Sequence, residues 1–290
     1  MKKLIIACFT VLSANSAQAQ ETRMKLWYDR PATQWVESLP LGNGRLGAMV
    51  YGDPIHEEFQ LNEETIWGGS PYNNTNPKAK EALPQIRQLI FEGRNKEAQA
   101  LCGPNICSQT ANGMPYQTVG SLHLDFEGIS SYSNYYRELD IEKAVTTTRF
   151  TAGGVTYTRE AFTSFPDQLL IIRLTASEKG KLSFTARYST PYQENITKSI
   201  SSRKELQMDG KANDHEGIEG KVQFTALTRI ERNGGHMESV SDTLLRVRNA
   251  NSVTIYVSIG TNFINYKDIS GNARKTAQTY LKNAGKNYLK

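Results

Sequence analysis

The chain has 290 residues, of which 38% are hydrophobic and 22% charged, and its formal net charge is +5 at pH 7. This composition supports a packed core and excludes a largely disordered or collagen-like chain. The positive charge is small and scattered, without basic runs that alternate with aromatic residues, so the sequence predicts no nucleic-acid partner.

Residues 1–19 have the pattern of a signal peptide. Lys2 and Lys3 precede the apolar run Leu4–Leu12, and Ala17-Gln18-Ala19 forms a cleavage site of the small-x-small type. The apolar run is too short to cross a bilayer, and no later run reaches the necessary length, so we expect no membrane span. The protein is therefore expected to be exported, to the periplasm or out of the cell.

One helix is expected early in the chain, over Lys78–Leu101. Asn76-Pro77 is a start signal and Gly103-Pro104 a stop signal. Apolar residues recur between them at three- and four-residue spacing, at Ala82, Leu83, Ile86, Leu89, Ile90 and Ala98.

Most of the following chain has the pattern of short strands. Gly153-Gly154 is a hairpin turn, and Asn233-Gly234-Gly235 is a second turn. Short strands that follow one another with turns between them predict a mostly β fold, a large antiparallel super-β-sandwich rather than a parallel α/β sheet. The predicted strands are Ser121–Phe126, Val145–Tyr157, Arg159–Phe165, Leu169–Thr175, Lys181–Ser189, Val222–Glu231, Leu244–Arg248 and Val253–Gly260.

The last segment, Gly271–Lys290, is polar and compatible with a helix. Its sparse apolar residues include Ala273, Ala277 and Leu281. We interpret it as a linker, or as the first helix of a following domain.

Two cysteines remain once a signal peptide containing Cys8 is removed. Cys102 and Cys107 are close in sequence, and an exported protein meets oxidising conditions, so a small disulfide loop is one interpretation and two free thiols the other. The histidines are isolated and no Cys/His pair has zinc-ligand spacing, so we predict neither a metal site nor a cofactor.

The most unusual motif is Gly42-Asn43-Gly44-Arg45-Leu46-Gly47, followed by Leu61-Asn62-Glu63-Glu64-Thr65-Ile66-Trp67. It is neither a dinucleotide fingerprint nor a phosphate loop. The architectural interpretation, which we favour, makes Arg45 pair with Glu63 or Glu64 and places Trp67 in the core. The functional interpretation makes Asn43, Arg45 and Trp67 substrate-binding candidates, with Trp67 or Trp35 stacking on a ring of the substrate.

The acidic residues do not form an obvious catalytic couple. Glu57-Glu58 and Glu63-Glu64 are neighbours, and neighbours on a strand point to opposite faces. Asp214-His215-Glu216 lies in a polar, glycine-rich stretch that predicts a solvated loop. These residues therefore supply no facing acid/base couple, and we predict no complete active site in this chain.

An ordered series of segments resembles the N-terminal domain of glycoside hydrolase family 95, the secreted α-L-fucosidases and their relatives. The segments are WVESLPLGNGRLGAMVYG, EFQLNEETIWGGSP, LPQIRQLIFEGRNKEAQ, YQTVGSLHLDF and YRELDIEKAVTTTRFTAGGVTYTREAFTSFPDQLLIIRL, within a match from about Trp27 to Asn265. The resemblance implies an N-terminal super-β-sandwich, then a helical linker and an (α/α)₆ barrel that carries the catalytic residues.

The resemblance implies hydrolysis of terminal α-L-fucosyl linkages with inversion, with a fucosylated glycan as partner. It divides the chain into a signal peptide at 1–19, a β-sandwich domain at 20–268 and the start of a linker at 269–290. No residue matches the family's catalytic motif, so no catalytic residue is carried over, and we expect this chain alone to be inactive.

Two other functions remain open from the residues. A stand-alone carbohydrate-binding sandwich would need an exposed aromatic platform, for example from Tyr132, Tyr135, Tyr136 or Tyr192. A mutarotase-like enzyme would need a histidine and a carboxylate that converge in one cleft.

Overall fold

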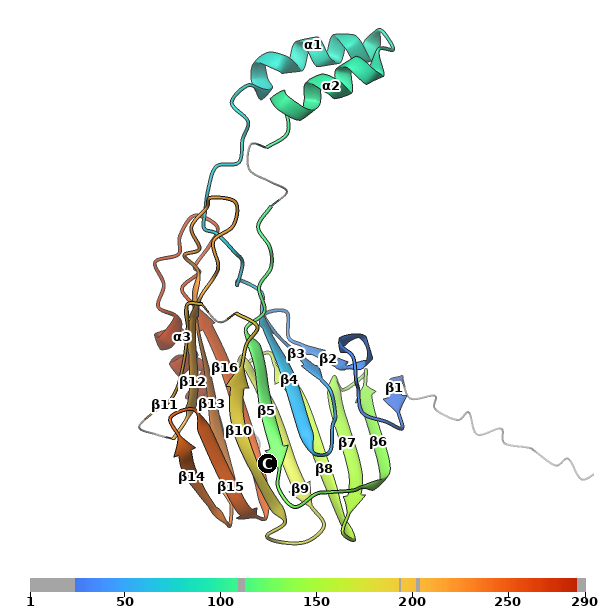
Figure 1. The fold of residues 1–290 in the computed structure, drawn as a ribbon, viewed down its shortest axis with the longest axis vertical. Helices are drawn as coiled ribbons and strands as arrows, with labels where there is room; N and C mark the ends of the chain where they lie inside the picture. Colours follow the sequence, from blue (N-terminus) through green and yellow to red (C-terminus); the bar gives the residue numbers. More distant parts are fainter. Residues whose placement is uncertain (1–23, 109–112, 193, 202–203, 286–290) are drawn as a thin grey trace, which may run out of the picture.

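The computed structural model describes residues 24–108, 113–192, 194–201 and 204–285. The signal peptide predicted at 1–19 lies outside these residues. Within the described chain two antiparallel sheets pack face to face, and a helix pair stands away from them on two long extended segments (Figure 1). The predicted fold class, a mostly β sandwich with an early helical insertion and a C-terminal helix, is confirmed.

The larger sheet has nine strands in the order β1-β6-β7-β8-β9-β16-β13-β12-β11 among the described residues. Their bounds are β1 (Lys25–Tyr28), β6 (Ser133–Asp140), β7 (Val145–Ala152), β8 (Val155–Ser164), β9 (Leu169–Ala176), β16 (Ser252–Thr261), β13 (Gln223–Asn233), β12 (Leu206–Lys211) and β11 (Ile196–Ile200).

The smaller sheet has seven strands in the order β14-β15-β10-β5-β4-β3-β2 over the same described ranges. Their bounds are β14 (His236–Ser241), β15 (Leu244–Ala250), β10 (Leu182–Ser189), β5 (Gly120–Phe126), β4 (His56–Glu63), β3 (Leu46–Val50) and β2 (Leu39–Gly42). A short 3₁₀ helix, η1 (Trp35–Glu37), precedes β2.

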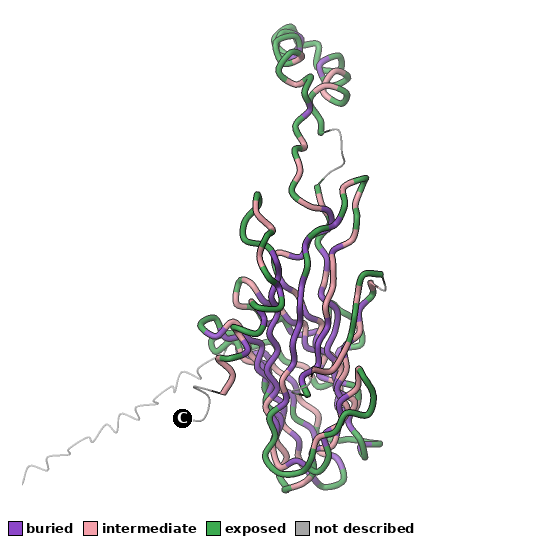
Figure 2. Tube along the Cα trace, turned by 90° about the vertical axis from the view of Figure 1, so that its left-hand side faces the viewer, coloured by how far each residue is buried: buried purple, intermediate pink, exposed green. Residues whose placement is uncertain are grey.

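The core lies between the sheets because the strands alternate buried and partly exposed residues. β10 shows the pattern clearly, with Leu182, Phe184, Ala186 and Tyr188 buried. Figure 2 shows the buried residues gathered in the sandwich, whereas the helix pair is mostly exposed. The predicted turn at Gly153-Gly154 joins β7 to β8, and both glycines have positive φ, as a two-residue hairpin turn requires.

α3 (Ala273–Leu281) packs on the outer face of the larger sheet. The Asn272 side chain caps it by accepting from the Lys275 backbone N–H at 2.8 Å. Gly260 permits the close approach, because a Cβ there would lie 2.5 Å from backbone atoms of the helix. Ala277 and Leu281 are buried against this face of the sheet. The predicted C-terminal helix is therefore present, and its role as a linker stays a prediction.

The predicted single early helix is two helices, α1 (Ala79–Phe91) and α2 (Asn95–Asn105). Gly93 at φ +76° ends α1, because its N–H bonds to the Ile90 carbonyl and the Arg94 N–H bonds to the Leu89 carbonyl, a Schellman ending. Apolar periodicity continues through this break, so the pattern alone suggested one helix. The pair shares a small core of its own, made by Ile86, Leu89 and Ala98.

Candidate functional site

The residues singled out in the sequence gather at the end of the sandwich from which the helix pair extends. Asn43 lies in the β2–β3 turn and fixes that turn itself. Its Oδ1 accepts from the backbone N–H groups of Arg45 (3.1 Å) and Leu46 (2.7 Å), and its Nδ2 donates to the Ser164 carbonyl at 2.9 Å. Gly44 beside it has φ +90°. The polar groups of Asn43 are thus engaged within the fold.

Arg45 joins four separate segments of the chain. Its Nη1 donates to Glu63 Oε1 (3.2 Å) and to the Ile259 carbonyl (2.8 Å), and its Nε donates to Gln168 Oε1 (2.6 Å). The guanidinium also lies 4.6 Å from the centre of the Tyr280 ring on α3. The predicted pairing of Arg45 with one of two glutamates occurs, and the partner is Glu63.

The Glu63 carboxyl group is buried and accepts hydrogen bonds from Arg45 and Thr65. Its side chain is 2% exposed, and its Oε2 accepts from the backbone N–H (2.8 Å) and hydroxyl (2.6 Å) of Thr65. Burial raises the pKa of Glu63, while the Thr65 hydrogen bonds and the Arg45 charge oppose that rise. Thr65 in turn bonds to the Thr261 hydroxyl at 2.7 Å. These contacts lock the end of β4 to the end of β16.

The other buried glutamate on β4 is also paired. Glu57 is fully buried and accepts from Arg159 Nη1 at 2.9 Å, and burial raises the pKa of Glu57 against the attraction of Arg159. Glu58, its neighbour in sequence, instead accepts from the Ser121 hydroxyl at 2.6 Å. The adjacent glutamates therefore face opposite ways, as alternation predicts. Both buried carboxylates serve as internal anchors rather than as a facing acid/base couple.

Trp67 lies at the root of the extended segments and is 45% exposed, so the expectation that it fills the core is wrong. Its indole N–H donates to the Glu64 carbonyl at 2.8 Å, and its ring meets Tyr116 edge to face at 5.4 Å. The Tyr116 hydroxyl donates to the Glu63 carbonyl at 3.2 Å, and burial raises the pKa of Tyr116 to about 12. These contacts fix the indole while leaving part of its ring uncovered.

Trp67 borders an apolar hollow of about 310 Å³, the Trp67 hollow, which is also lined by Tyr72, Met114, Phe263, Tyr266 and Ile269. Tyr266 is 73% exposed at its rim. Exposed aromatic rings around an apolar depression mark a surface suited to a sugar ring or to another protein domain. The substrate-binding roles suggested for Asn43, Arg45 and Trp67 stay predictions, and only Trp67 lines this hollow.

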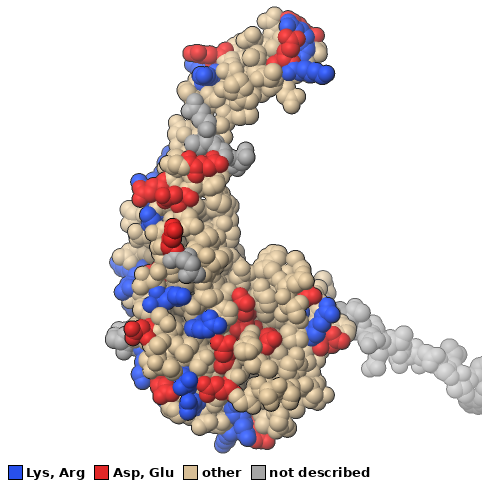
Figure 3. Space-filling model, in the orientation of Figure 1, with Lys and Arg blue, Asp and Glu red and all other residues tan. Residues whose placement is uncertain are grey.

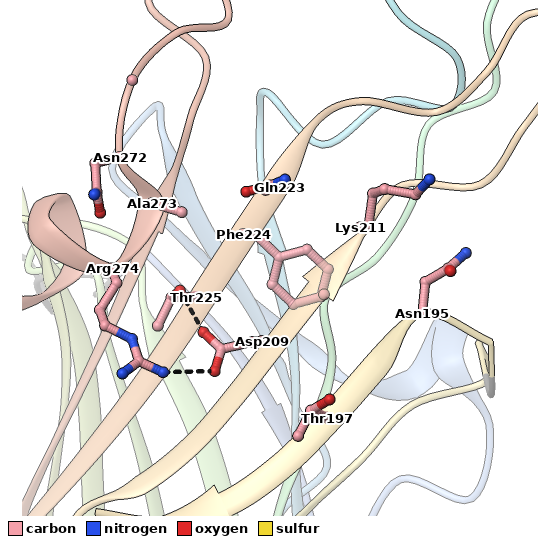
Figure 4. A pocket seen from close by; sticks show the side chains of 12 residues that line it. Asn195, Thr197, Asp209, Lys211, Gln223, Phe224, Thr225, Asn272, Ala273 and Arg274 are labelled. Atoms are coloured by element: carbon pink, nitrogen blue, oxygen red, sulfur yellow. Dashed lines mark hydrogen bonds and ion pairs between the residues drawn. The ribbon is translucent and has the colours of Figure 1, made fainter.

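A second hollow, of about 400 Å³, lies on the outer face of β11, β12 and β13 beside the start of α3 (Figure 4). Asp209 on β12 accepts from the Thr225 hydroxyl (2.6 Å) and from Arg274 Nη2 (3.1 Å). Its lining residues come from three strands and a helix, so no sequence motif marks it. The only hint in the sequence is the alternation of polar residues along Asn195–Ser199 and Gln207–Lys211.

The tyrosines proposed as a binding platform do not share one exposed face. Tyr135 points inward, where its hydroxyl donates to the Gly52 carbonyl at 2.7 Å, whereas Tyr136 stacks on Trp27 with ring centres 6.2 Å apart. Tyr132 packs against Tyr135, with 5.8 Å between the ring centres. Tyr192 is partly exposed in the segment before β11.

Other sequence candidates lie apart from both hollows. His56 meets Asp125 at 2.9 Å, but its side chain is 74% exposed and lines neither hollow. Cys102 is half-buried and Cys107 exposed, and both are free cysteines in the structure, so their disulfide stays a prediction. Trp35 is 55% exposed in η1.

Among the described residues, no group of three or more His, Cys, Asp or Glu side chains is placed to hold a metal ion. In the same part of the chain, no helix is both long enough and apolar enough to cross a membrane.

The chain is similar in sequence to curated proteins with fucosidase names. It is 33% identical over 266 residues to alpha-L-fucosidase 2 of Arabidopsis thaliana, which covers 83% of this chain and 30% of that protein. It is 35% identical over 164 residues to probable alpha-fucosidase A of Aspergillus niger, 52% of this chain and 20% of the relative. The chain thus spans less than a third of the length of these two relatives.

The fold is similar to that of a solved structure described as a putative kojibiose phosphorylase from human microbiome. The TM-score is 0.51 at 12% identity, over 91% of this chain and 36% of the other. This likeness concerns the fold alone.

The family model described as "Glycosyl hydrolase family 65, N-terminal domain" matches residues 26–266. The recognition of this chain as an N-terminal domain of a glycoside hydrolase, with α-L-fucosidases among its relatives, is therefore confirmed. Because the model matches most of its length, the chain belongs to the glycosyl hydrolase family 65 N-terminal domain family.

Proposed function

We propose that this chain is the supporting, non-catalytic β-sandwich of an exported α-L-fucosidase-type hydrolase. The hydrolysis of terminal α-L-fucosyl linkages with inversion would be carried out by a catalytic portion that follows the sandwich in such enzymes. The observation that carries the proposal is the match of most of this chain to less than a third of two proteins named as fucosidases.

The two buried carboxylates of β4 support a non-catalytic role. Inverting hydrolysis needs an acid and a base that face each other across the sugar with room for a water molecule. Glu63 is engaged by Arg45 and Thr65, and Glu57 by Arg159. Each is 2% exposed or less, so neither is placed to reach a glycosidic oxygen.

The Trp67 hollow supports a role in docking the catalytic portion. Figure 3 shows the molecule bent like a hook, hollowed between the helix pair and the sandwich, with few charged side chains along the inner side of the bend in this view. Phe91 on α1 is 87% exposed, and Tyr266 beside the hollow is 73% exposed. Exposed apolar side chains of this kind favour burial by another domain.

The activity is tested with an aryl α-L-fucoside and three samples: this chain, a separately expressed catalytic portion of a family member, and their mixture. We expect no turnover by the chain alone and turnover that appears or rises strongly on mixing. Turnover by the chain alone would contradict the proposal, as would a mixture no more active than the catalytic portion.

The export part of the proposal rests on the pattern of residues 1–19. Expression in a secreting host followed by N-terminal sequencing tests it. We expect the mature chain to begin at Gln20 and to be recovered outside the cytoplasm. A mature chain that retains Met1 would contradict export by this route.

A further inference from the structure

The outer face of β11, β12 and β13 presents polar side chains in rows across the three strands. Register places Thr197, Asp209 and Thr225 in one such row, because Thr197 pairs with Asp209 and Asp209 with Thr225. The next row, at the end of β12, contains Lys211 and Gln223. α3 stands beside these rows and turns the face into a groove. We define the polar groove by Asn195, Thr197, Asp209, Lys211, Gln223, Thr225 and Arg274.

The groove continues past Arg274 into a further hollow of about 540 Å³, which reaches Glu205, Arg229 and Gln278. Arg274 lines both hollows, so the two are neighbours along α3. Each volume falls within the ~300–1,000 Å³ range of small-molecule sites. Together they make an elongated depression rather than a compact pocket, a shape that suits a chain-like ligand.

The charges of the groove are largely neutralised by one another. Asp209 pairs with Arg274 at 3.1 Å, Glu205 with Arg229 at 2.8 Å, and Lys211 with Glu219 at 3.6 Å. Lys282 adds one charge at the far end. The groove therefore offers no concentrated field for a phosphate or for a metal ion, and its chemistry favours an uncharged ligand.

Its amide and hydroxyl groups supply hydrogen bonds for such a ligand. The side chains of Asn195, Thr197 and Gln223 make no hydrogen bond within the part of the chain that the structure describes, and all three line the groove. An amide both donates and accepts, as does a hydroxyl, so these groups match the hydroxyls of a sugar. Thr225, 2% exposed, and Asp209 form a hydrogen-bonded floor beneath them.

From these observations the geometry points to a glycan-binding groove on the outer face of β11–β13, which takes a neutral oligosaccharide chain. It shares no lining residue with the Trp67 hollow. It would hold polymeric substrate beside the end of the sandwich proposed to dock the catalytic portion, since Gln223 of the groove directly follows Val222 of the Trp67 hollow. The site needs no turnover, so it stands independently of the proposed hydrolase function.

The test is NMR titration of the chain with three neutral oligosaccharides, 2′-fucosyllactose, lacto-N-tetraose and cellohexaose, with inorganic phosphate as an anionic probe. We expect at least one oligosaccharide to shift the side-chain amide signals of Asn195 and Gln223 in a saturable way, and phosphate to leave them unchanged. Shifts confined to the Trp67 indole would overturn the proposal, as would no saturable shift with any of the three or stronger binding of phosphate.

The double variant Asn195→Gly/Gln223→Ala removes two side-chain amides of the groove without straining the backbone. Asn195 has φ +62°, a conformation that glycine adopts readily. We expect binding to weaken at least ~10-fold, which corresponds to about 1.4 kcal/mol. The matched control is Asn134→Gly/Gln85→Ala, because Asn134 is also exposed with positive φ (52°) and Gln85 is exposed on α1. Equal affinities of the two variants would overturn the assignment.

Discussion

Replacing Arg45 with methionine tests whether the most unusual motif of the sequence is architectural. The substitution keeps most of the aliphatic length but removes the donors to Glu63, Gln168 and the Ile259 carbonyl. Removing one partner of a buried ion pair costs about 3–5 kcal/mol. Arg45 is 18% exposed and Thr65 still donates twice to Glu63, so we expect the lower end, about 3 kcal/mol.

The loss should depend on pH in a defined direction. Burial already raises the pKa of Glu63, and the loss of Arg45 raises it further. A carboxyl group whose pKa is raised by folding contributes stability below its unfolded pKa, and that contribution disappears as the pH rises through its folded pKa. The Arg45→Met variant should therefore lose more stability at about pH 8 than at about pH 5, because protonated Glu63 tolerates burial without the guanidinium.

The assay is thermal and urea unfolding followed by circular dichroism at both pH values. About 3 kcal/mol corresponds to a fall in Tm of roughly 6–12 °C. The matched control is Arg173→Met, because Arg173 is an exposed arginine on β9 with no ion pair in the described chain. Equal losses in the two variants, or a loss that is independent of pH, would refute the architectural role of Arg45.

Three further predictions concern the buried ion pair, a close backbone contact and the exposed indole. Arg159→Met leaves Glu57 buried without its partner, so the free energy of unfolding should fall by about 3–5 kcal/mol in urea titrations; a fall below ~1 kcal/mol would contradict this. Gly120→Ala puts a Cβ 2.2 Å from the Ser189 carbonyl oxygen on the neighbouring strand β10, at φ +128°. It should lower the free energy of unfolding by at least ~3 kcal/mol. Gly128→Ala, at φ +79° in open space, should cost only about 1–2 kcal/mol, and equal costs would refute the steric argument. Trp67→Ala should leave Tm within a few degrees but weaken binding of the catalytic portion at least ~10-fold in a titration, because the indole is 45% exposed beside the apolar hollow; unchanged affinity would exclude it from the interface.

The sequence predicts the central strands well because burial imposes alternation on them. β10 and β16 pack against both neighbours and the opposite sheet, so their apolar residues recur regularly. The edge strand β14 is almost wholly exposed, and β11 is partly or fully exposed throughout. These strands have no buried face that the sequence must encode, so their pattern resembles that of loops.

The two candidate sites also differ in how far the local sequence predicts them. Trp67 and Arg45 lie in short glycine-rich motifs whose turns require particular residues, so the sequence points to them. The direction of the Trp67 ring depends on Tyr116, which is far away in the chain, and the sequence therefore misplaced the ring in the core. The polar groove is assembled from Asp209, Thr225 and Arg274 only when the strands pair and α3 docks, so no local sequence pattern predicts it.

The measurement that tests the central claim most directly is hydrogen exchange of this chain with and without the catalytic portion of a family member. If the end of the sandwich that carries the Trp67 hollow docks that portion, backbone amides around Trp67, Tyr116 and 263–266 should gain protection on mixing, while those of the exposed strand β14 should not change. Protection confined to β14, or none anywhere in a mixture that hydrolyses the fucoside, would contradict the proposal that this end of the sandwich supports the enzyme.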